Sequence, residues 1–221
     1  MKAQKVTDNC LWLKDKKKIL ATKNLTPGEN VYGENLVKFK NDEYRVWNPT
    51  RSKLGAAIYK GTKCPINKSD IVLYLGSASG TTASHVSDII GPSGLIYCVE
   101  ISPRVMRDLV FLAEKRKNMA PILESAGRTS AYENLIVQAD FMFQDIAQKD
   151  QAEIFIKNKR FLKKGGYAML AVKARSVDVT KKPNEIFNLV EKKIGEHFKI
   201  MDKKRLEPFE KDHMVFLVKN H

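Results

Sequence analysis

Residues 76–82 form a loop of small residues that could hold a nucleotide-like cofactor. The residues that would approach the ligand are Gly76, Ala78, Gly80, Thr81 and Thr82. Glycine and alanine allow close approach of the backbone, and the two threonines start a helical pattern whose free N–H groups would face the same pocket. Further along, the apolar run 95–99 ends in Glu100. A carboxylate at a strand tip can bind both hydroxyls of a ribose, so the pattern predicts a pocket for an adenosine-containing cofactor.

The spacing of this loop favours S-adenosylmethionine. The loop reads G-x-A-x-G, whereas the dinucleotide fingerprint is G-x-G-x-x-G. A Gly-Lys-Ser/Thr phosphate loop is absent, and Ala78 occupies the place of the serine in a nucleophile elbow. A short loop without a pyrophosphate cradle suits a cofactor whose tail is a zwitterionic amino acid. The alternative is a purely structural strand-to-helix turn.

Two polar residues end apolar runs and could carry out methyl transfer. Asp145 ends the run 139–145, and Lys173 ends the run 167–173. A ribose 2'-hydroxyl must lose its proton as it attacks a methyl group. A lysine, with an ordinary pKa of about 10.4, accepts that proton only if its ammonium form is disfavoured, and Lys53 is a candidate for the second ammonium that would do so. Asp145 would then orient Lys173. Alternatively, Lys173 stays charged and stabilises the developing alkoxide.

Alternating strand and helix patterns would bring these residues together. The predicted strands are 71–75, 95–100, 120–123, 139–145 and 167–173, and the predicted helices are 82–90, 103–116, 147–162 and 184–198. Gly165-Gly166 is interpreted as the stop of the third helix. The runs 199–206 and 214–218 lack a helix between them and predict an antiparallel pair at the sheet edge. This is the α/β arrangement of class I methyltransferases, a Rossmann-like, mostly parallel seven-stranded sheet. Ligands of such sheets bind at the carboxyl ends of the strands, which here carry Gly76, Glu100, Ser125, Ala126, Asp145 and Lys173.

The chain divides into two parts. Residues 1–50 are predicted to form a small β-rich N-terminal domain, because short apolar runs alternate with turn signals. Residues 51–221 are predicted to form the methyltransferase domain, which opens with a short helix near 54–59.

Charge and composition favour an RNA partner. Thirty-nine Lys and Arg against 25 Asp and Glu give a net charge of +14, which favours a polyanion. A lysine-rich surface produced by growth at high temperature is the alternative explanation. The chain has no apolar run of membrane-spanning length and no signal-peptide pattern. Its three cysteines form no C-x-x-C pair, which predicts reduced thiols, a cytoplasmic protein and no metal site.

Several long motifs resemble archaeal fibrillarins, and together they cover almost the whole chain. They lie at residues 24–28, 31–34, 44–49, 51–58, 74–87, 102–104, 145–148, 172–180 and 207–213. The resemblance implies S-adenosylmethionine-dependent 2'-O-methylation of ribose in rRNA and tRNA. It also implies a box C/D ribonucleoprotein in which a guide RNA selects the target and a Nop-family scaffold protein and a ribosomal-type, kink-turn-binding protein complete the particle.

The resemblance also implies roles for single residues. Cofactor contacts fall on Thr81, Thr82, Glu100, Ile101, Ser125, Ala126, Asp145, Ile146, Ala147 and Gln148. Related ribose methyltransferases use a Lys-Asp-Lys-Glu tetrad, whose places are filled here by Lys53, Asp145, Lys173 and His213.

Two positions depart from the fibrillarin pattern. Fibrillarins usually carry Gly-Asp-Ala where this chain has Glu124-Ser125-Ala126, and the Asp is expected to hold the adenine amine. Loss of that charged acceptor predicts cofactor binding weaker by about ten- to a hundredfold. Gln144 stands where Glu is common.

Two other functions are weighed against this one. The first is a non-catalytic, structural RNA-binding component of the same particle, which the departure at Ser125 would favour and the presence of Lys53, Asp145 and Lys173 disfavours. The second is a nicotinamide-dependent oxidoreductase, which the loop spacing and the positive charge disfavour. Because no sequence-reading RNA module is evident, the isolated chain is expected to bind RNA weakly and in a salt-sensitive way.

Overall fold

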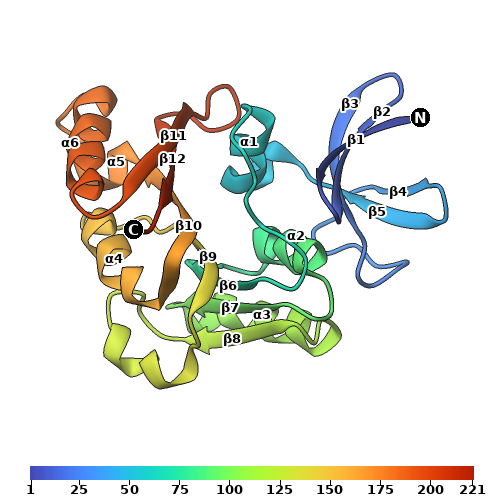
Figure 1. The fold of residues 1–221 in the computed structure, drawn as a ribbon, viewed down its shortest axis with the longest axis horizontal. Helices are drawn as coiled ribbons and strands as arrows, with labels where there is room; N and C mark the ends of the chain where they lie inside the picture. The colour runs from blue at the N-terminus through green and yellow to red at the C-terminus, as the bar shows by residue number, and fades with distance from the viewer.

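The computed structural model describes residues 1–221 and contains two β-sheets (Figure 1). The smaller sheet has five antiparallel strands in the order β1-β2-β3-β5-β4. Its strands are β1 (Lys2–Thr7), β2 (Cys10–Lys14), β3 (Lys18–Lys23), β4 (Leu36–Phe39) and β5 (Asp42–Val46). The expectation of a β-rich N-terminal part is confirmed. The first strand was not predicted, because all but its last two residues are exposed and polar or small, without an apolar alternation.

The larger sheet has seven strands in the order β11-β12-β10-β9-β6-β7-β8. They are β6 (Ile71–Leu75), β7 (Leu95–Glu100), β8 (Met119–Leu123), β9 (Ala139–Gln144), β10 (Leu162–Lys173), β11 (Lys199–Arg205) and β12 (His213–Lys219). The five neighbouring strands β10, β9, β6, β7 and β8 pair in parallel, whereas β12 is antiparallel to both β10 and β11. The predicted class I methyltransferase arrangement, with its antiparallel last pair, is confirmed.

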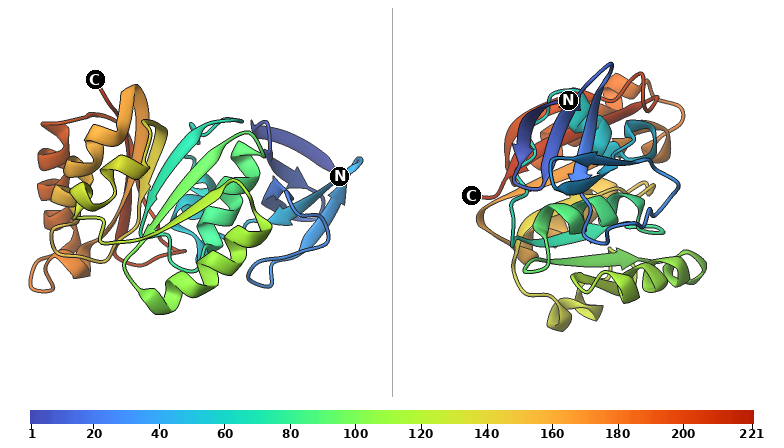
Figure 2. Two further views of the ribbon diagram at one scale, coloured as in Figure 1. Left: turned by 90° about the horizontal axis from the view of Figure 1, so that it is seen from below. Right: turned by 90° about the vertical axis from the view of Figure 1, so that its right-hand side faces the viewer.

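Helices cover both faces of the larger sheet (Figure 2). On one face lie α1 (Lys53–Tyr59), α2 (Thr81–Ile90) and α3 (Pro103–Lys115), and on the other lie α4 (Gln151–Asn158), α5 (Ala174–Val177) and α6 (Pro183–Gly195). The small sheet lies at the opposite end of the molecule from α4 and α6 (Figure 1). No helix in the protein combines the length and the apolar character that crossing a bilayer requires.

The small sheet shares its core with the larger one. Cys10, Leu20 and Trp47 belong to the same buried cluster as Ala57 of α1 and Val86 of α2. The cluster that the small sheet holds by itself contains three buried residues. The domain boundary near residue 50 therefore stays a prediction, since the two sheets pack as one body there.

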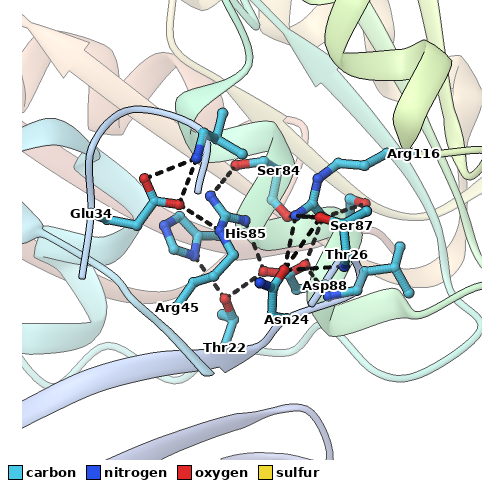
Figure 3. Close-up of polar contacts among 12 residues, drawn as sticks. Thr22, Asn24, Thr26, Glu34, Arg45, Ser84, His85, Ser87, Asp88 and Arg116 are labelled. Atoms are coloured by element: carbon cyan, nitrogen blue, oxygen red, sulfur yellow. Dashed lines mark hydrogen bonds and ion pairs between the residues drawn. The ribbon is translucent and has the colours of Figure 1, made fainter. Parts of the chain in front are cut away.

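Buried charges also join the two sheets (Figure 3). Asp88 of α2 accepts hydrogen bonds from Nη1 of Arg45 at 2.8 Å and from Nη1 of Arg116 at 2.6 Å, and all three side chains are at most 1% exposed. Nε of Arg45 also donates to Glu34 at 2.6 Å. The network satisfies charges that would otherwise be costly to bury. It ties β5 and the end of α3 to α2.

The predicted helix 147–162 is wrong at both ends. Helix α4 is shorter and is followed by the 3-10 turn η4 (Lys159–Phe161) and then by β10, so Gly165 and Gly166 lie inside a strand and are not a helix stop. Gly165 has a φ of +76°, and a Cβ on Gly166 would lie 2.9 Å from the carbonyl oxygen of Lys163. The two glycines lie at an irregularity in the pairing of β10 with β9. In the sequence, a Gly-Gly pair at such an irregularity looks the same as a helix C-cap.

Candidate active site

The site begins where the larger sheet reverses its strand order. From β6 the chain extends the sheet first through β7 and β8, and then on the other side through β9 and β10. Such a switch point leaves a crevice at the carboxyl ends of the strands. Gly76 follows β6, and Asp145 follows β9, with the N–H of Asp145 donating to the carbonyl of Leu75 at 2.9 Å.

Gly76 keeps the floor of this crevice narrow. It has a φ of +82°, in the left-handed region that favours glycine. A Cβ at this position would collide with the backbone carbonyl of Asp145 and would lie 2.7 Å from Cγ2 of Ile146. The glycine is therefore required for the loop after β6 and the loop after β9 to touch.

One cavity of about 300 Å³ lies on the β7 side of the crevice. It is lined by Gly76, Ala78, Val99, Glu100, Ile101, Glu124, Ala126, Asp145, Ile146, Ala147 and Gln148. Glu100 is fixed at its rim, because Oε2 accepts from the N–H of Ala78 and Oε1 from the N–H of Ser102, both at 2.9 Å. A mixed apolar and carboxylate lining of this kind suits a nucleoside.

A second cavity of about 450 Å³ continues the first toward α1 and β12. The two share Gly76, Ala78, Asp145, Ile146 and Ala147, so they form one cleft. The second cavity adds Arg51, Lys53, Tyr74, Ser77, Thr81, Thr82, Lys173, Glu210 and His213. The four residues predicted to be catalytic therefore lie together, next to the first turn of α2.

Lys53 and Asp145 form an ion pair inside this cleft. Nζ of Lys53 lies 3.0 Å from Oδ2 of Asp145, and both side chains are 22% exposed. Burial raises the pKa of Asp145 above its ordinary value, while Lys53 acts in the opposite direction and favours the carboxylate. Lys53 is the first residue of α1, whose N-cap Ser52 accepts from the N–H of Gly55 at 3.1 Å and from Oγ1 of Thr82 at 2.9 Å. The start of α1, and with it Lys53, is thus tied to the first turn of α2.

Lys173 and His213 face each other across β10 and β12. His213 is 6% exposed, and its Nδ1 lies 2.6 Å from the carbonyl oxygen of Lys211, which fixes the ring. Nζ of Lys173 makes no hydrogen bond or ion pair within the protein. The expectation that Asp145 orients Lys173 is therefore wrong for this structure, because Asp145 is paired with Lys53.

Comparison with known proteins identifies this arrangement. The fibrillarin family model matches residues 1–221. The chain belongs to the fibrillarin family. It is 55% identical over 202 residues to the fibrillarin-like rRNA/tRNA 2'-O-methyltransferase of Thermococcus onnurineus, covering 90% of this chain and 89% of the relative.

Solved fibrillarin structures share the whole fold. Fibrillarin of Aeropyrum pernix, solved in complex with natively bound S-adenosyl-L-methionine, superposes with a TM-score of 0.87 at 44% identity and covers 98% of this chain and 99% of its own. A fibrillarin in complex with Nop5p superposes with a TM-score of 0.90 at 37% identity, with coverage of 99% and 100%.

Two residues expected at the cofactor pocket, one from the loop pattern and one from the fibrillarin resemblance, do not line either cavity. Ser125 instead accepts the N–H of Gly127 at 3.3 Å through its hydroxyl. Gly80 is the N-cap of α2 with a φ of +95°, and a Cβ there would lie 3.0 Å from Cδ1 of Leu109 on α3. Gly80 is needed for packing of the loop against α3.

Glu124 supplies a carboxylate that the sequence reasoning missed. It lines the cavity on the β7 side, where Ser125 does not reach. Its Oε1 accepts from the N–H of Ser125 at 2.7 Å and from Nη1 of Arg128 at 3.3 Å, which leaves lone pairs free. Compared with the Gly-Asp-Ala of other fibrillarins, the carboxylate stands one position earlier here, and the sequence Glu124-Ser125 already shows this. The sequence does not show the direction of the side chain in the loop.

Gln144 uses one end of its side-chain amide, because its Nε2 donates a hydrogen bond whereas its buried Oε1 has no partner. The side chain is fully buried, and Nε2 donates to the carbonyl oxygen of Gln151 at 2.6 Å. An ionised Glu could not make that bond. Gln151 in turn accepts from the N–H of Lys173 at 3.3 Å, so this amide pair connects β9 to the end of β10.

Proposed function

We propose that this chain transfers a methyl group from S-adenosylmethionine to the ribose 2'-hydroxyl of rRNA and tRNA. The observation that carries the proposal is the Lys53–Asp145 ion pair, which lies in the same cleft as the unpaired Lys173 and adjoins a cavity whose lining suits a nucleoside. Curated fibrillarin relatives at 53–55% identity are named rRNA/tRNA 2'-O-methyltransferases, which supports the reaction and both classes of RNA.

The residues of the cleft fit S-adenosylmethionine. Glu100 would bind the ribose hydroxyls of the cofactor, and Glu124 would accept a hydrogen bond from the adenine amine. Gly76 leaves the backbone open for the cofactor's central part. The first turn of α2 has no side-chain cap, so its N–H groups can bind the carboxylate of the methionine tail. When bound, the cofactor supplies an electrophilic methyl group on a sulfonium.

The basic residues of the cleft would act on the attacking ribose. As the bond from O2' to the methyl carbon forms and the carbon–sulfur bond breaks, the 2'-hydroxyl proton must leave. Lys173 is free of any carboxylate and lines the cavity, so it can accept the proton or stabilise the alkoxide. His213 lies beside Lys173 on the neighbouring strand and would orient the ribose. Asp145, held by Lys53, complements the sulfonium charge.

A ribonucleoprotein would present the RNA. The fibrillarin structure solved with Nop5p supports a Nop-family scaffold as the direct partner. We extend this to a box C/D guide RNA that selects the target by base pairing and to a kink-turn-binding protein that holds the guide. A net charge of +14 suits such a particle. The three cysteines are buried and unpaired, which supports our proposal that the protein works in the reducing cytoplasm.

Two measurements test this function. Calorimetric titration of the chain with S-adenosylmethionine should give saturable binding, and NADH, as the control, should give none. A particle assembled with the Nop-family protein, guide RNA and target should transfer one methyl group per target. A target carrying 2'-deoxyribose at the selected nucleotide should receive none, and equal transfer to both targets would refute ribose 2'-O-methylation.

A further inference from the structure

Arg51 is an exposed cation at the mouth of the catalytic cleft. It ends the 3-10 turn η1 (Pro49–Arg51), two residues before Lys53. It lines the catalytic cavity and also a neighbouring cavity of about 330 Å³ that lies against Tyr32, Trp47 and Tyr59. Its guanidinium group forms no hydrogen bond or ion pair with any other residue of the protein. Its five donors are therefore available to a ligand that also reaches the cleft.

The ring of Tyr32 positions Arg51. The guanidinium carbon lies 5.9 Å from the centroid of the Tyr32 ring, within cation–π range. The Tyr32 hydroxyl is held by His85, whose Nε2 lies 2.8 Å away, and it accepts from the N–H of Asn48 at 3.3 Å. An arginine on a fixed aromatic ring loses less entropy on binding than a free one.

His85 is itself fixed by the buried network that joins the two sheets (Figure 3). Oγ1 of Thr22 donates its hydrogen to Oδ2 of Asp88 at 2.7 Å, so it must accept from Nδ1 of His85 at 2.8 Å. Nε2 of the neutral ring then accepts from the Tyr32 hydroxyl. Trp47 stacks on the imidazole, with ring centroids 4.8 Å apart and planes 13° apart. The buried network therefore ends in the ring on which Arg51 rests.

We propose that Arg51 binds a backbone phosphate of the RNA strand that carries the methylated ribose, and that Tyr32 is its positioning residue. The inference rests on the proposed function. An unpaired guanidinium beside a site that accepts ribose meets a phosphate on either side of that ribose, and its planar fork matches phosphate oxygens. Phosphate contacts carry no sequence information, so this contact sets register and leaves target choice to base pairing.

A coupling experiment on the assembled particle tests the proposal. Wild type and Arg51→Gln are assayed on an unmodified target and on targets that each carry one neutral methylphosphonate near the selected ribose. On the unmodified target, Arg51→Gln should lower kcat/KM about tenfold, mainly through KM. At one target-strand position the methylphosphonate should lower the kcat/KM of wild type to that of Arg51→Gln, and it should not lower the kcat/KM of the variant any further. Tyr32→Leu should show part of the same loss at the same position, and Arg51→Lys should recover part of it.

The controls separate the possible failures. Arg107 of α3 is also exposed and unpaired, and it lines none of the cavities described here, so Arg107→Gln should retain wild-type kcat/KM. If the variant and the methylphosphonate lower kcat/KM independently at every position of both strands, so that their effects multiply, the proposal is overturned. Coupling to a guide-strand phosphate alone would overturn the assignment to the target strand. If the wild-type particle methylates no ribose, the proposed function fails. The salt dependence of RNA binding then still tests Arg51, because its removal should reduce the slope of log Kd against log salt by about one, and an unchanged slope would refute the contact.

Discussion

Nζ of Lys53 lies 3.0 Å from Oδ2 of Asp145, although 92 residues separate them along the chain. The contact joins the first residue of α1 to the loop after β9, and it supplies the partner that a half-buried carboxylate requires. It also leaves Lys173 without a carboxylate partner, as the role proposed for Lys173 toward the ribose hydroxyl requires.

Removal of this partner should affect both rate and pH dependence. Lys53→Met should lower the rate of methyl transfer about a hundredfold, by the loss of one preorganised charge. Because burial raises the pKa of Asp145 and Lys53 opposes that effect, the variant should hold Asp145 protonated up to a higher pH. Cofactor affinity that depends on the carboxylate should be lost as pH falls, and at a higher pH in the variant than in wild type.

Calorimetric titrations with S-adenosylmethionine over a range of pH measure the second effect directly. Lys60→Met is the matched control, because Lys60 is the C-cap of α1 and its Nζ donates a hydrogen bond only to the exposed carbonyl of Glu207. Identical pH profiles for wild type and Lys53→Met would show that the ion pair does not govern Asp145.

Glu124 and Ser125 should differ sharply in their effect on the cofactor. Glu124→Gln should weaken S-adenosylmethionine binding by roughly tenfold, the effect of losing a charged acceptor. Ser125→Ala should leave affinity within about twofold, since Ser125 does not line the cavity. The reverse order of effects in calorimetry would return the adenine contact to Ser125.

The buried network should govern the stability of the whole chain. Asp88→Asn leaves Arg45 and Arg116 without their shared carboxylate at nearly zero exposure, and should cost about 3–5 kcal/mol in free energy of unfolding. Asp42→Asn removes an ion pair with Lys23 in which both side chains are over 40% exposed, and should cost less than about 1 kcal/mol. Urea unfolding compares the two variants. Equal losses would mean that the buried charges contribute no more than surface ones.

His85 should make the protein less stable in mild acid. Burial, with Arg45 and Arg116 nearby, holds the pKa of His85 well below its ordinary 6.5. The unfolded chain therefore binds a proton below pH 6.5 that the folded chain does not, so stability present above that pH is lost as pH falls. Between pH 7.5 and 5.5 wild type should lose about 1 kcal/mol more than His85→Gln, measured by urea unfolding. A loss of equal size in both would assign the pH dependence to other groups.

Much of the site follows from strand ends. The loops after predicted strands hold Gly76, Glu100 and Asp145, and the rule that parallel strands end at one edge is enough to gather them. The contribution of Glu124 depends on how one loop turns after β8, and Arg51 depends on a short turn outside the sheet. Hydrophobic periodicity does not predict where the side chain of Glu124 or that of Arg51 points.

The interior of α2 shows another limit of sequence reasoning. Its buried residues include Ser84, His85 and Asp88, which hydrophobic periodicity would place toward solvent. They are buried because Arg45 and Thr22 of the small sheet reach them, and the order of strands in that sheet determines this contact. Polar partners that are distant in sequence are therefore visible only in the folded structure.

The most direct test of the catalytic role of Lys173 is the rate of methyl transfer to the selected ribose by a particle assembled with Lys173→Ala. The variant should bind S-adenosylmethionine and assemble with the Nop-family partner and guide RNA as wild type does, since Nζ of Lys173 makes no hydrogen bond or ion pair within the protein. It should lose at least about a hundredfold in methyl transfer to the selected ribose. Transfer at the wild-type rate would contradict the catalytic role of Lys173 and with it the chemistry assigned to this cleft.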